Sequence, residues 1–146
     1  MITMHLPKAT LLVLVLLAPA CNDAPSSTGA ASATAKPVSK EDCTKLTRAF
    51  ELQGARMAQL GRNADITGSV DVYQQYASDL DLLSLRDGDL KTVFEEHRQH
   101  VKRAVEGGRK AADPATKSQG MSVFMVEAGK AGEAKRRIDT ICADAR

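Results

Sequence analysis

Two histidines lie one helical turn apart in the middle of the chain. His97 and His100 are three positions apart, and Glu96 precedes the first of them. On a helix this spacing puts both imidazoles on one face, where they can supply two ligands to a transition metal. The rest of the chain offers no second cluster of His or Cys to complete a tetrahedral site, and no Glu-x-x-His pair. We therefore keep metal binding by His97, His100 and Glu96 as an alternative to ordinary roles, with His97 at the edge of a core and His100 at the surface.

Other catalytic or cofactor chemistry has little support in the sequence. There is no Cys-x-x-Cys-His for covalent haem and no Gly-x-Ser-x-Gly turn for a nucleophilic serine. Met57 and His97 can be drawn as a haem ligand pair, but a Met at helical spacing usually fills a core. Four aspartates are clustered without the calcium-loop pattern, namely Asp79, Asp81, Asp87 and Asp89. We expect no enzymatic activity and no cofactor.

The first 20 residues have the composition of an export signal. Lys8 gives a weakly basic start, and an uninterrupted apolar run extends from Leu11 to Leu17. Such a run is too short for a permanent transmembrane helix, which takes about 20 apolar residues, but it is typical of a signal-peptide core. The segment ends with the sequence Leu17-Ala18-Pro19-Ala20-Cys21.

This ending resembles the lipobox of bacterial lipoproteins, in which a small residue precedes an invariant Cys; the resemblance covers the first 21 residues. It implies that Cys21 becomes the new N-terminus, with diacylglycerol on its sulfur and usually an acyl chain on its nitrogen. The protein would then be anchored to a membrane of the bacterial cell envelope, with its domain outside the cytoplasm. The pattern departs from the family at Ala18, where Leu is usual. Because Ala18-Pro19-Ala20 also fits ordinary signal peptidase, a secreted protein that starts at Cys21 remains the alternative.

Residues 21–38 are expected to be the lipidated Cys and a disordered tether. Residues 22–38 are mainly Ala, Ser, Thr, Gly and Pro. Such a segment buries too little apolar surface to offset its ordering entropy. As a random coil of about 17 residues it would reach roughly 20–25 Å.

Residues 39–146 are predicted to form an all-α domain, because their apolar residues recur at helical spacing. Ser39 followed by Asp42 has the shape of a capping box, and Gly61 suits the end of a first helix. A second helix is expected after Thr67 or Ser69 and is broken at residues 86–89, where Asp87 can cap a third.

Glycines and one proline mark the second half of the domain. Gly107-Gly108 is expected to weaken the end of the third helix, and Asp113-Pro114 to open the fourth. Gly129 and Gly132 are expected to interrupt the fourth helix or to let a neighbour approach closely. Four amphipathic helices with short loops predict an up-down-up-down four-helix bundle.

The remaining two cysteines fall at one pole of this predicted bundle. Cys43 lies at the start of the first helix and Cys142 at the end of the fourth, both on apolar stripes. Three Cys in an exported protein leave one odd, and the lipobox accounts for Cys21. We therefore predict a Cys43–Cys142 disulfide, with two buried free thiols as the alternative.

Charge gives no reason to expect nucleic acid as a partner, since the net charge is +2 and the basic stretch 91–117 lacks interleaved aromatics. The sequence predicts a non-enzymatic interaction or structural module that meets the membrane through its lipid anchor and contacts an unidentified envelope protein. The alternative is a ligand- or metal-binding envelope protein.

Overall fold

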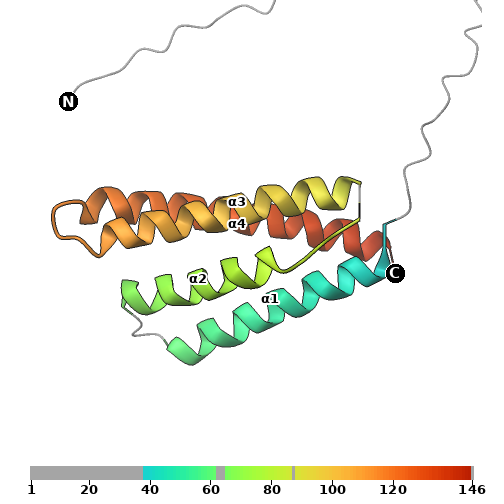
Figure 1. Cartoon of the computed structure of the whole chain (residues 1–146), viewed down its shortest axis with the longest axis horizontal. Coiled ribbons are helices and arrows are strands. Elements are labelled where there is room, and N and C mark those ends of the chain that lie inside the picture. The colour runs from blue at the N-terminus through green and yellow to red at the C-terminus, as the bar shows by residue number, and fades with distance from the viewer. Residues whose placement is uncertain (1–37, 62–64, 87, 146) are drawn as a thin grey trace, which may run out of the picture. The chain divides into compact units, whose positions relative to one another are not determined.

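The computed structural model describes residues 38–61, 65–86 and 88–145, and within these ranges every regular element is an α-helix. The helices are α1 (Lys40–Leu60), α2 (Ile66–Asp81), α3 (Asp89–Ala111) and α4 (Lys117–Asp144) (Figure 1). The prediction of an all-α domain is confirmed. The predicted signal peptide, Cys21 and the predicted tether up to residue 37 lie outside the described residues. Val38, the last residue of the predicted tether, is half-buried and packs against the core.

The first helix begins and ends where its local sequence predicts. Ser39 has an extended backbone and its hydroxyl oxygen accepts a hydrogen bond from the backbone N–H of Asp42, at 3.4 Å. Gly61 follows the last residue with a φ of 71°, a conformation that glycine adopts without steric cost. Both ends of α1 are therefore encoded within a few residues of the boundary.

The second helix starts earlier than predicted. It begins at Ile66, and its N-cap is Asp65 instead of Thr67 or Ser69. The Asp65 carboxylate accepts a hydrogen bond from the backbone N–H of Gly68, at 2.8 Å. Asp at this position satisfies an otherwise unpaired donor of the first turn, so the helix gains part of a turn.

The fourth helix starts later than predicted. Its first residue is Lys117 and its N-cap position is Thr116, whereas the sequence favoured a start at Asp113. The Asp113 carboxylate instead accepts from the backbone N–H of Ala115, at 2.9 Å, and so forms a turn. The Thr116 hydroxyl donates to the carbonyl of Lys110, at 2.7 Å, which ties the turn back to α3. For the third helix, Gly88 holds the N-cap position, and the predicted cap Asp87 is outside the described residues.

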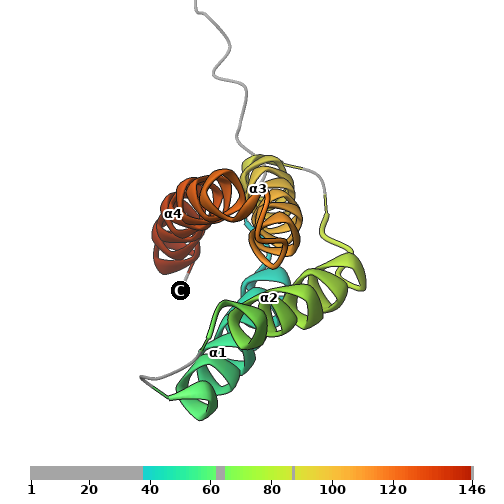
Figure 2. The same cartoon turned by 90° about the vertical axis from the view of Figure 1, so that its left-hand side faces the viewer.

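The four helices pack unequally. Viewed nearly end-on, α3 lies beside α4, and α2 lies beside α1 (Figure 2). The α3–α4 contact is the most extensive, α2 packs against α3, and α1 makes its helix contact chiefly with α2. The arrangement is bundle-like, with α3 and α4 as its most tightly packed pair.

Glycines explain the close α3–α4 approach, but they are not Gly129 and Gly132, to which the sequence analysis gave that role. A Cβ on Gly120 would lie 2.3 Å from the backbone nitrogen of Ala111, and a Cβ on Gly107 would lie 2.7 Å from that of Phe124. Gly107 does not end α3, which continues to Ala111. Around Gly129, in contrast, nothing lies within 4 Å of an added Cβ, and the same holds for Gly132. Their predicted role in close packing is wrong.

The core draws side chains from all four helices. The largest fully buried ones are Tyr76, Phe94, Leu46, Leu80, Ile138 and Val101. A smaller cluster of Val70, Ala104 and Phe124 joins α2, α3 and α4. In the part of the chain that the structure describes, no helix has the length and apolar character needed to cross a membrane.

Candidate functional site

His97 lies at the centre of the domain, where all four helices meet. It projects from α3 and only 3% of its surface is exposed. Its Nδ1 is 2.8 Å from the carbonyl oxygen of Ala131 in α4, and its Nε2 is 2.6 Å from the hydroxyl of Tyr76 in α2. Phe50 of α1 meets the imidazole edge to face, with the ring centroids 5.4 Å apart. The sequence placed His97 at the edge of the core, and the structure places it inside.

These partners decide where the proton sits on the imidazole. A carbonyl oxygen can only accept a hydrogen bond, so Nδ1 of His97 donates to Ala131. Nε2 of the neutral ring is then an acceptor, and the Tyr76 hydroxyl donates to it. Burial lowers the pKa of His97 and raises the pKa of Tyr76, so both groups are held neutral. With both ring nitrogens engaged, His97 is a satisfied polar group of the core.

His100 faces another partner. Its Nδ1 is 2.7 Å from a carboxylate oxygen of Glu127, so this pair bridges α3 and α4 near the surface. Lys130 also contacts the Glu127 carboxylate, at 3.0 Å. The hydrogen bond from His100 is the main reason that the pKa of Glu127 is lowered. Glu127 is therefore an acceptor shared between hydrogen-bond donors on two helices.

Glu96 is the third residue of the predicted metal site, and its partner differs from those of both histidines. Its carboxylate pairs with the guanidinium of Arg137, at 2.6 Å, on the exposed surface. The three predicted ligands thus have separate partners. His97 contacts Tyr76 and Ala131, His100 contacts Glu127, and Glu96 contacts Arg137. Among residues 38–61, 65–86 and 88–145, no three His, Cys, Asp or Glu side chains are close enough together to hold a metal ion.

The predicted cysteine pair is joined. The Cys43–Cys142 disulfide has an S–S distance of 2.06 Å and links the first turn of α1 to the last turns of α4. Both cysteines are buried. They form part of the wall of a groove of about 610 Å³. Its other lining residues are Lys40, Thr44, Thr47, Arg48, Glu51 and Ala145. The polar residues of this lining all lie on α1, in agreement with the sparse packing between α1 and α4.

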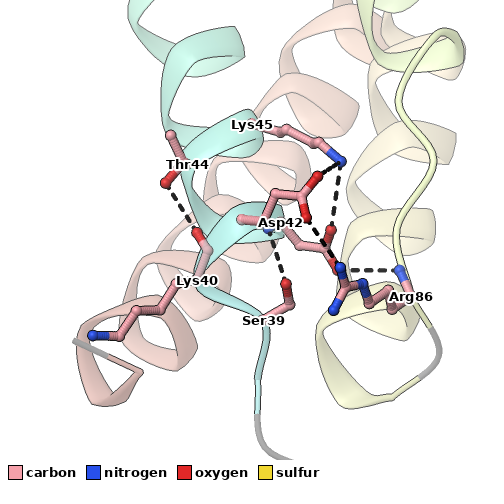
Figure 3. A network of polar contacts seen from close by, with 7 residues as sticks. Ser39, Lys40, Asp42, Thr44, Lys45 and Arg86 are labelled. Carbon is pink, nitrogen blue, oxygen red and sulfur yellow. Dashed lines mark hydrogen bonds and ion pairs between the residues drawn. The ribbon is translucent and has the colours of Figure 1, made fainter.

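A polar network at the same first turn fastens α1 to the segment that precedes α3 (Figure 3). The carboxylate of Asp42 is buried and accepts from the backbone N–H of Arg86, at 3.1 Å. Lys45 lies 3.9 Å from the same carboxylate. On the exposed side, the Arg86 guanidinium pairs with Glu41, at 3.0 Å.

Three residues of these contacts were missed by the sequence analysis. Tyr76 had a usable signal, because it stands three residues after Tyr73 and four before Leu80 on the apolar stripe of α2. Asp42 was recognised only as a capping residue, since its partner is a backbone amide 44 residues away. Glu127 carried no signal, because its partner lies on a different helix.

The comparisons with known proteins add no relative. No protein-family model matches the chain, and neither the curated proteins nor the solved structures provide a match.

Proposed function

We propose that this protein is a lipid-anchored bacterial cell-envelope lipoprotein whose helical domain is a non-enzymatic interaction or structural module. The observation that carries the proposal is the use of its cysteines. Of the three, Cys43 and Cys142 are consumed by one disulfide, and Cys21 at the lipobox-like sequence is left for lipid. Structural disulfides persist in oxidising compartments, which favours a domain outside the cytoplasm.

The domain is proposed to be an up-down-up-down four-helix bundle. Successive helices run in opposite directions in Figure 1, and each sequential pair makes contact. In such a bundle the chain enters α1 and leaves α4 at the same pole. The lipid chains at Cys21 would do the anchoring, since each buried CH₂ contributes about 0.8 kcal/mol and two or three chains hold a protein firmly on a bilayer.

The alternative of a metal or small-ligand site at His97 and His100 is not favoured by the geometry. Both ring nitrogens of His97 already have protein partners, and Nδ1 of His100 is engaged by Glu127. Contacts within the fold account for these polar groups without a further ligand, as a non-enzymatic interaction module requires.

Lipidation is tested by expressing the full chain in an exporting bacterial host with labelled palmitate. The wild type should incorporate label and fractionate with membranes. Cys21→Ser should lose both properties, because serine offers no sulfur for the diacylglycerol. The matched control, Cys43→Ala with Cys142→Ala, should keep the label. Mass spectrometry of the intact protein, with and without reductant, detects both the lipid and the disulfide in one sample. An unmodified wild-type N-terminus, or label retained by Cys21→Ser, refutes the proposal.

A further inference from the structure

The four helices converge on one buried imidazole, and its Nε2 accepts a hydrogen bond from Tyr76, which only the neutral ring can do. From this geometry we infer that His97 is a proton-sensitive contact at the centre of the domain, so that mild acid loosens the fold from within. The inference is independent of lipidation, because it concerns only contacts among α1, α2, α3 and α4.

A second proton on His97 has no acceptor in this arrangement. It would enter at Nε2, which now accepts the hydrogen bond from Tyr76 at 2.6 Å. The Tyr76 hydroxyl can turn to offer its oxygen, but its own hydrogen then loses the nitrogen that accepted it. A buried donor without an acceptor costs about 1–3 kcal/mol, and a buried cation adds a desolvation penalty. The imidazolium form is therefore disfavoured inside the fold.

Neighbouring charges do not reverse this preference. From α4, Lys135 opposes a charge on His97 and Asp139 favours one, but these two pair with each other at 2.6 Å. From α3, His100 opposes it. The α2 contact is the neutral Tyr76, and α1 contributes the uncharged ring of Phe50. Burial is the largest influence, and it lowers the pKa of His97.

The sign of the pH effect follows from this lowered pKa. The unfolded chain protonates His97 near its ordinary value of 6.5, whereas the folded chain resists protonation. The unfolded state therefore binds more protons below that pH, and stability falls as the pH falls. If folded His97 stays neutral throughout, the unfolding equilibrium constant rises by up to about thirtyfold between pH 7.5 and pH 5.0.

The test is urea unfolding of the purified full chain across that pH range. The wild type should lose stability toward pH 5.0. His97→Asn keeps an amide donor near Ala131 and cannot titrate, so its stability should be nearly flat with pH. His100→Asn is the matched control on the same helix, one turn away, and should keep most of the wild-type dependence. A wild-type slope that persists in His97→Asn, or disappears in His100→Asn, overturns the inference.

A second measurement covers the case in which His97→Asn does not fold. The imidazole NMR signals of the wild type are followed from pH 8 downward. The expected spectrum has His97 as the Nδ1–H tautomer, unchanged through pH 6.5 until the domain unfolds. Titration of His97 at or above 6.5 within the folded protein refutes the inference directly.

Discussion

Removing the Cys43–Cys142 disulfide should cost this domain a large part of its stability. The bond closes a loop between residues 99 positions apart. In the chain-entropy account, a loop of this length restricts the unfolded chain enough to contribute about 4–5 kcal/mol. Small domains have total unfolding free energies of about 5–15 kcal/mol. Because α1 packs chiefly on α2, few contacts between α1 and α4 are available to compensate.

The variant for this test is Cys43→Ala with Cys142→Ala, compared with the wild type by urea unfolding at pH 7.5. The unfolding free energy should fall by about 3–5 kcal/mol. The m-value should rise, because an unfolded chain without the cross-link exposes more surface. Alanine is chosen because both cysteines are buried, and serine would bury a hydroxyl as well.

Reduction of the wild type is the matched control. With a phosphine reductant, its unfolding curve should approach that of the double variant, and the double variant should not respond. A loss below about 1 kcal/mol with an unchanged m-value would refute the reasoning, because the bond would then neither restrict the unfolded chain nor hold α1 to α4.

Four further substitutions are checked by the same urea assay at pH 7.5. Gly120→Ala should destabilise by about 1–3 kcal/mol, since its Cβ would meet backbone at 2.3 Å, whereas Gly129→Ala in the same helix should stabilise by about 0.5–1 kcal/mol. Asp42→Ala should cost about 1.5–3 kcal/mol, because a backbone N–H loses a charged acceptor. Tyr76→Phe should cost about 1–2 kcal/mol by leaving His97 Nε2 unpaired. Equal effects of the two glycine changes, or neutral effects of the two polar ones, would contradict the packing and the hydrogen bonds described.

Helix boundaries were predictable where the chain itself supplies the partners. Ser39 and Gly61 bound α1 through contacts within one turn, so the sequence alone is sufficient there. At the start of α4 the local signal of Asp113-Pro114 is strong, yet the helix starts later. The decisive contacts are with α3, where the Thr116 hydroxyl meets a carbonyl and Gly120 lies against backbone. Apolar contacts between helices leave a periodic stripe in the sequence, but a single hydrogen bond or close backbone contact between two helices does not.

The polar centre of the fold was predictable only in part. His97 stands on the apolar stripe of α3, so its position near the core could be expected. Its burial depends on the carbonyl of Ala131, which lies within α4 and has a second lone pair available. Such a backbone acceptor cannot be predicted from the type of residue that carries it. The cysteine pair was easier, because a disulfide needs only two side chains of one type at one pole.

If the protein is anchored at Cys21 as proposed, a pull on the anchor reaches the domain at the first turn of α1. A domain held at Cys21 is pulled through Ser39, which is the residue before α1 begins. Within four residues of that point, the cap hydrogen bond closes the first turn of α1. The Asp42 contact to Arg86 and the disulfide at Cys43 connect α1 to two other parts of the domain, the segment before α3 and the end of α4. The helix with the sparsest packing therefore has its strongest attachments at its entry point. Because the disulfide is covalent, a pull from the tether would be transmitted from Cys43 to Cys142 in α4 and not through the α1–α2 contact alone.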